Sequence, residues 1–171
     1  VVGGLTATVI VAMGLVIGHA LARGGRAAPA LDGLAMLAFL VPSSVLGIGL
    51  VSAWNRPSTQ AVYTTAAILV LGLAARYAFL GVRTLAAVLH RSSAHYEEAA
   101  AASGAGYIRR MTHIVVPMHW RGIAVAWLIA LVFCLRDLDT VVSFYPPGLE
   151  PLPVRIFTLE ANGPEAIVAG L

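Results

Sequence analysis

The sequence contains no lysine: all 11 of its basic residues are arginine. Without lysine the chain can neither form a Schiff base nor build the phosphate-binding loop of nucleotide hydrolases. We therefore expect no cofactor in this chain and any ATP hydrolysis in a partner chain. The single cysteine, Cys134, excludes a disulfide within the chain. Charged residues make up only 11% of the 171 residues, against roughly a quarter in soluble domains.

Hydrophobic residues make up 59% of the sequence and form long runs. A membrane-spanning helix needs about 20 mostly apolar residues. The runs predict an all-α membrane protein with five spans, of which the last is truncated. Their approximate bounds are 1–21, 30–54, 60–82, 122–145 and 164–171. Because both ends of the chain fall within apolar patterns, we expect a fragment of a longer membrane protein.

The long polar segment 83–121 separates the third predicted span from the fourth. If this segment is cytoplasmic, the loop 22–29 lies on the same side of the membrane. Seven arginines then face the cytoplasm, and two, Arg56 and Arg155, lie on the opposite side. Such an excess is typical of cytoplasmic loops. The net charge of +3 thus reports topology, and we expect no nucleic-acid partner.

A charged cluster, Arg136, Asp137 and Asp139, interrupts the fourth predicted span. At a rise of about 1.5 Å per residue, Arg136 lies about 21 Å from the inner end of that span, and Arg76 lies about 24 Å from the outer end of its own. We therefore expect Arg76 to reach the cytoplasmic headgroups without pairing with the cluster. The cluster lines an outer vestibule or braces the outer loop. Bracing is favoured because Arg136 and Asp139 are one helical turn apart.

The polar segment predicts two short helices joined by a turn. Ser93 can cap a helix over 94–103, which Gly104 would end, and a second helix is expected over 107–115. We expect Gly104 either to have a positive φ or to be crowded by the second helix. An ordinary interfacial loop is the alternative.

Six residues at fixed spacing give this segment its pattern: Glu98, Ala99, Ala100, Gly104, Ile114 and Pro117. The pattern resembles the EAA loop of binding-protein-dependent ABC importer permeases, which reads E-A-A, three residues, G, nine residues, I-x-L-P. Every spacing matches, and Val116 stands for the usual Leu. The resemblance covers essentially the whole chain. It implies a type I ABC importer transmembrane core over 1–171, with the six residues in its ATPase-coupling loop, 83–121.

A narrower pattern lies around the fourth span and the outer loop. It consists of Leu135-Arg136-Asp137-Leu138, Phe144-Tyr145-Pro146-Pro147-Gly148 and Leu152-Pro153-Val154-Arg155-Ile156. This pattern resembles the permeases of ferric-iron importers and their thiamine- and phosphonate-type relatives. It implies ferric iron as the first candidate solute, with thiamine, phosphonate or polyamine as alternatives. Such permeases are often duplicated, so this chain is a candidate for the C-terminal half of one.

The resemblance implies a transport subunit rather than an enzyme, in the inner membrane of a bacterium. Its implied partners are a cytoplasmic ABC ATPase dimer, a second permease half in the same chain or in a homologous subunit, and a periplasmic solute-binding protein. The helix around Glu98 would dock in a cleft of the ATPase.

The alternative is a self-contained channel or secondary transporter. A secondary transporter usually has charged residues and broken helices at the middle of the membrane. The predicted mid-depth of each span contains no acidic residue, which favours the importer.

Overall fold

The computed structural model describes residues 1–146 and 148–162. These residues form helices and no strand, so the predicted all-α fold is confirmed. The elements are α1 (Val2–Ala22), α2 (Ala28–Leu40), α3 (Ser43–Trp54), α4 (Gln60–Tyr63), α5 (Ala66–His90), α6 (His95–Ala102), α7 (Tyr107–Arg110), the π-helical turn η1 (Met111–Val115), α8 (Val116–Met118), α9 (Trp120–Arg136), α10 (Leu138–Val141) and α11 (Leu152–Asn162). The predicted span 164–171 lies outside the described residues.

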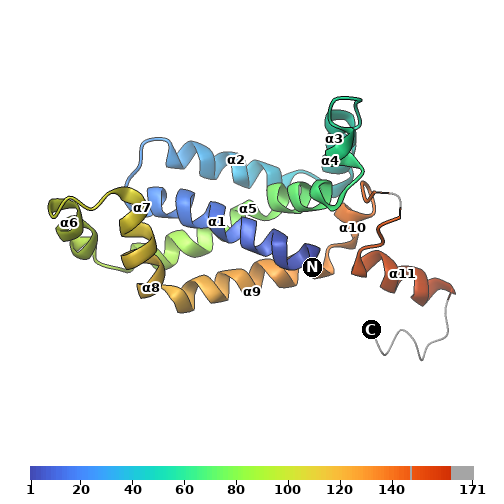
Figure 1. Cartoon of the computed structure of the whole chain (residues 1–171). Helices are drawn as coiled ribbons and strands as arrows, with labels where there is room; N and C mark the ends of the chain where they lie inside the picture. Colours follow the sequence, from blue (N-terminus) through green and yellow to red (C-terminus); the bar gives the residue numbers. More distant parts are fainter. Residues whose placement is uncertain (147, 163–171) are drawn as a thin grey trace.

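The centre of the fold is the pair α1 and α5, which run side by side (Figure 1). Glycines let their backbones touch. A Cβ built on Gly14 would lie 2.6 Å from the carbonyl of Gly81, and one built on Gly18 would lie 2.8 Å from the carbonyl oxygen of Val82. Such small residues allow close helix packing in membranes. α9 packs against both helices, and α2 packs against α5.

Two helices, α1 and α5, are each long and apolar enough to cross a membrane among the residues described. Two bent pairs would qualify if each counted as one span: α2 with α3, and the helix of residues 107–118 with α9. The main core lies between α1, α5 and α9, where Ile10, Leu69 and Ala130 are buried. The outward sides of α2 and α9 expose large apolar side chains, including Leu34, Leu37, Leu128 and Val132.

The predicted span 30–54 is not one straight helix. α2 and α3 meet at an angle of 108°, and the break falls at Val41 and Pro42. Val41 is extended, with φ −63° and ψ 131°. The ring of a proline disfavours the helical conformation in the residue before it, and proline has no N–H to continue a helix. The apolar run therefore continues while the helix stops.

The third and fourth predicted spans are also divided. The run 60–82 becomes α4 and then α5, which starts where the Ala67 N–H donates to Thr65 Oγ1 at 3.4 Å. α5 continues to His90, inside the segment predicted as loop. The run 122–145 stops being helical at Asp137, which has φ −79° and ψ 90° and begins the short α10.

Candidate functional site

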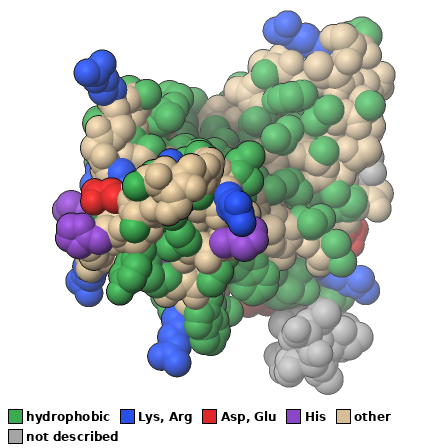
Figure 2. Space-filling model, turned by 60° about the vertical axis from the view of Figure 1, so that its left-hand side comes forward, with side chains coloured by type: hydrophobic (Ala, Val, Ile, Leu, Met, Phe, Trp, Pro, Cys, Tyr) green, Lys and Arg blue, Asp and Glu red, His purple; other side chains and the backbone are tan. Residues whose placement is uncertain are grey.

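The segment between α5 and α9 contains the two short helices that the sequence predicts. α6 covers His95–Ala102, close to the predicted range 94–103, and the His95 N–H donates to Ser93 Oγ at 3.3 Å. This segment lies at one end of the molecule, beyond the long helices (Figure 1). Figure 2 shows charged and histidine side chains exposed at this end, beside a largely hydrophobic flank.

The turn after α6 depends on Gly104. The N–H groups of Gly104 and Ala105 donate to the carbonyls of Ala101 and Ala100, each at 2.9 Å, which is the pattern of a Schellman cap. Gly104 has a φ of +84°, whereas a Cβ at this position would meet nothing within 4 Å. Of the two expectations for Gly104, the positive φ is confirmed and crowding is wrong.

The second short helix is longer than predicted. α7, η1 and α8 follow one another through Pro117 to Met118, and the chain then bends by 84° at His119 into α9. Met111 and Val115 are buried against Leu89 of α5 and hold this helix in place. Of the residues in the loop pattern, Ile114 is half-buried and Pro117 is exposed.

The predicted coupling residues on α6 face outward. The side chain of Glu98 is 69% exposed, and its ion-pair partner is the still more exposed His95, whose Nδ1 lies 3.4 Å from Glu98 Oε2. Ala99 is exposed and Ala100 is half-buried. This face therefore combines an accessible carboxylate with small side chains that would let another surface approach closely.

The preceding residue, Glu97, faces inward and was missed as a site residue. Its Oε2 lies 2.6 Å from His19 Nε2, and its Oε1 accepts a hydrogen bond of 2.6 Å from Arg23 Nη2. Arg23 also donates to the carbonyl and to the hydroxyl of Ser92, each at 3.2 Å. We call Glu97, His19, Arg23 and Ser92 the Glu97 clamp, because they join α6 to the C-terminal end of α1.

The electrostatics of the Glu97 clamp favour an ionised carboxylate. Burial raises the pKa of Glu97, but hydrogen bonds and charge from His19 and Arg23 outweigh it and hold this pKa below its usual value. The sequence contained one signal of this site. His19 is an ionisable residue in an otherwise uncharged span, and Arg23 follows it at a four-residue spacing that places both side chains on one helix face.

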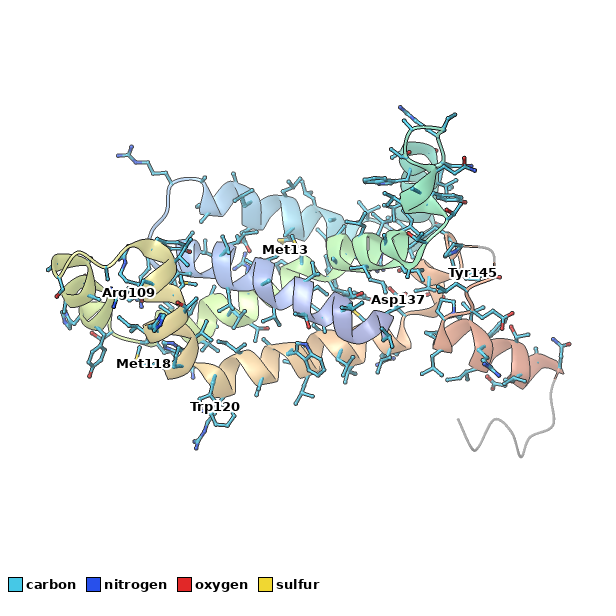
Figure 3. The ribbon with its side chains drawn as sticks, in the orientation of Figure 1. Met13, Arg109, Met118, Trp120, Asp137 and Tyr145 are labelled. Atoms are coloured by element: carbon cyan, nitrogen blue, oxygen red, sulfur yellow. The ribbon has the colours of Figure 1, made fainter. Side chains whose placement is uncertain are left out.

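Asp137 organises a second charged site at the opposite end of the molecule, where Figure 3 labels it at the junction of α9 and α10. Its Oδ2 accepts a hydrogen bond of 2.8 Å from the Tyr77 hydroxyl and lies 3.6 Å from Arg76 Nε. Its Oδ1 accepts a hydrogen bond of 3.0 Å from the Thr140 N–H and so caps α10. Arg76 Nη1 also donates to the Val41 carbonyl at 3.1 Å, at the break between α2 and α3.

The expectation that Arg76 reaches the cytoplasmic headgroups, away from the cluster, is wrong. The depth estimate started from Gln60, but Gln60 belongs to the separate helix α4, and α5 starts only at Ala66. Counted back from His90 at the C-terminal end of α5, Arg76 lies about 21 Å along the helix, and Asp137 lies about 25 Å from the N-terminal end of α9. The two side chains are therefore at similar heights.

The expected neutralisation of Arg136 by Asp139 is also not found. No ion pair joins these two residues, both of which lie in the described part of the chain and are exposed. Asp137 ends α9 between them, so they do not share one helix. The charge that matters for packing is that of Asp137, which is 8% exposed.

A third charged contact joins α2 to α5. Arg83 Nη2 lies 2.6 Å from Asp32 Oδ2, and the Asp32 side chain is buried. No group of three His, Cys, Asp or Glu side chains suited to holding a metal ion occurs among residues 1–146 and 148–162.

The chain is similar in sequence to proteins of Salmonella. Over 126 residues it is 31% identical to a protein named as a 2-aminoethylphosphonate transport system permease protein, PhnV, of Salmonella paratyphi A, and 30% identical to the PhnV of Salmonella typhimurium. Each alignment covers 72% of this chain and 46% of the relative. The chain thus spans about half the length of these curated relatives.

A family comparison covers more of the chain. Residues 10–159 match the family described as "binding-protein-dependent transport system inner membrane component". The match extends from α1 to α11 and includes both short helices between α5 and α9. This chain, with its apolar helices and its helix–turn–helix between α5 and α9, therefore belongs to the family of inner-membrane components of binding-protein-dependent transport systems.

Proposed function

We propose that this chain is the permease part of an ATP-driven importer and that the outer face of α6 is the docking site for a separate ATPase. The observation that carries the proposal is the contrast between two neighbouring residues of α6. Glu97 is buried against α1, whereas Glu98 is exposed without a buried partner. Because one face of α6 is held against α1 and the other face is exposed, α6 can bind a second protein and remain attached to the rest of this chain.

The proposed docking end faces the cytoplasm. Arg109, Arg110 and Arg121 lie in or beside the short helices at this end, as expected of a cytoplasmic segment. The proposed partners are an ABC ATPase dimer at this end, a solute-binding protein at the opposite end, and a second permease half. In the bilayer, the exposed apolar faces of α2 and α9 would contact lipid or that second half.

We propose an organophosphonate such as 2-aminoethylphosphonate as the solute. The support is the similarity to the two Salmonella relatives, which are named as permeases of 2-aminoethylphosphonate transport systems. Ferric iron is the second candidate, supported by the sequence pattern around Arg136 and Asp137.

The test requires the full-length protein that contains this chain, reconstituted in lipid vesicles with its ATPase and its solute-binding protein. We expect ATP hydrolysis and uptake to rise when 2-aminoethylphosphonate is added with the binding protein. A rise with ferric iron alone would reassign the solute but keep the importer. Uptake that continues without any ATPase would instead support the self-contained channel or secondary transporter.

A further inference from the structure

Contacts at the inner end of α1 reach three parts of the segment between α5 and α9. Arg23 binds Ser92, in the linker before α6, and Glu97, within α6. His19 binds Glu97, and its ring packs edge-on against the Tyr107 ring of α7 with 5.7 Å between the centroids. A single turn of α1 and the residue after it therefore hold the linker, α6 and α7 together.

The covalent connections of α6 are less restrictive than these contacts. Between His90 at the end of α5 and His95 at the start of α6 there is only a short non-helical linker, and the turn at Gly104 follows α6. Non-helical backbone of this kind can change its dihedral angles. A displacement of α6 would therefore be taken up in the linker and the turn, and would not reach α1, unless side-chain contacts held α6 in place. Glu97, which is 5% exposed, is the buried residue of α6 and makes the contacts that hold this helix against α1.

We propose that Glu97 is a positioning residue for coupling: through His19 and Arg23 it makes α6 and the inner end of α1 move as one piece. This inference rests on the proposed function, because it assumes that an ATPase moves α6. The movement then passes from α1 to α5 across their glycine contacts, where the backbones of Gly14 and Gly81 touch. Glu98 makes the contact with the partner, and Glu97 transmits the resulting movement.

The first experiment compares Glu97→Ala with Glu98→Ala in the complete reconstituted complex. For Glu97→Ala we expect the ATPase to co-purify at the wild-type level, while stimulation of ATP hydrolysis by the loaded binding protein falls about tenfold, because the buried partners of Glu97 lose their carboxylate. For Glu98→Ala we expect the ATPase itself to be lost. Stimulation within about twofold of wild type in Glu97→Ala would overturn the proposal, and so would loss of the ATPase from that variant.

A second experiment replaces the clamp with a covalent bridge. The triple variant His19→Cys, Glu97→Cys, Cys134→Ala is treated with a short bifunctional thiol reagent, which joins positions 19 and 97 through bonds that a reductant cleaves. We expect stimulation to be low before bridging, to return when the bridge forms and to disappear again on reduction. A purely local role in folding would not respond reversibly in this way.

Each result of the bridging experiment decides the question. Bridged protein that remains unstimulated would overturn the proposal, even if Glu97→Ala proves too poorly folded to assay. If the wild-type complex recruits no ATPase, the proposed function fails first and the inference falls with it. If the wild type is stimulated and bridging has no effect, only the inference fails.

Discussion

Glu97 and Glu98 are adjacent, but their side chains leave α6 about 100° apart, because an α-helix has about 3.6 residues per turn. That rotation buries one carboxylate among His19 and Arg23 and leaves the other in solvent. Replacing Glu97 by lysine would place a cation beside Arg23. A change at Glu97 is therefore unsuitable as a neutral control for one at Glu98.

For Glu98→Lys we expect weaker binding of the ATPase. A charge-assisted contact at a partly desolvated interface contributes about 1.5–3 kcal/mol, so binding should weaken tenfold or more, since about 1.4 kcal/mol is a factor of ten. The measurement is the affinity of the purified permease for its ATPase. Glu160→Lys, a charge reversal on exposed α11, is the matched control and should bind normally. Equal affinity in the two variants would contradict the docking role of α6.

Gly104→Ala should loosen the end of α6. At a φ of +84° a Cβ costs about 1–2 kcal/mol, although it would meet no neighbouring atom. We expect hydrogen exchange of the last α6 amides to accelerate about five- to thirtyfold. Gly106→Ala is the control, because Gly106 also has open space around it but has a φ of −66°. Similar exchange in both variants would show that the turn is not strained.

Among the helices, α5 is the element to which the others attach. Gly81 touches the backbone of α1 at Ile10, Arg83 pairs with Asp32 of α2, and Arg76 reaches Asp137. These three contacts lie within about two turns of one helix. Disturbing α5 should therefore separate helices that are distant in sequence.

Gly81→Ala should destabilise the pair α1 and α5. Its Cβ would lie 2.6 Å from the Ile10 carbonyl oxygen, and overpacking of this kind costs about 1–3 kcal/mol. Thermal unfolding can be followed through the reactivity of Cys134, which is 4% exposed in the fold. We expect a lower midpoint for Gly81→Ala than for wild type. Gly33→Ala, where a Cβ meets nothing within 4 Å, should not lower it.

The contact between Arg76 and Asp137 can be measured with a double-mutant cycle of Arg76→Met and Asp137→Asn. Asparagine removes the charge but keeps an acceptor oxygen for the Thr140 N–H, and its amide N–H can donate to the Tyr77 hydroxyl oxygen. Each single variant leaves a largely buried charge unpaired, with side-chain exposures of 19% for Arg76 and 5% for Asp137. We expect the double variant to be more stable than the sum of the singles by about 0.5–3 kcal/mol. Strict additivity of the unfolding free energies would show that the two groups do not interact.

At the scale of the whole molecule, the helices α6 to α8 should lie on the cytoplasmic side. Ala101→Cys and Gly106→Cys should react with a membrane-impermeant thiol reagent only when it is applied from the cytoplasm. Ser58→Cys, exposed between α3 and α4, should react only from outside. In intact cells, labelling at position 101 together with protection at position 58 would show that the chain has the opposite orientation in the membrane.

Local patterns in the sequence predicted those helices and turns whose ends are set by residues close by in the sequence. The apolar run at the N-terminus became α1, and the glycine stop and the short helices appeared near their expected positions. The charged contacts of Glu97, Asp137 and Asp32 could not be predicted in this way, because each of them joins segments distant in sequence. Arg76 illustrates the difficulty: its height depends on where α5 begins, and an apolar run containing α4 gave the wrong starting point.

Because α1 and α5 are in contact along their length, the pair can tilt as one rigid unit, and a small tilt at one end becomes a larger displacement at the other. A helix of 25 residues such as α5 is about 37 Å long. If the pair tilts by about 10° about the end next to α6, its opposite end travels about 6 Å. That opposite end is where Asp137, Arg76 and the break at Val41 lie. A small rotation imposed at α6 would thus become a displacement comparable to the width of a small solute.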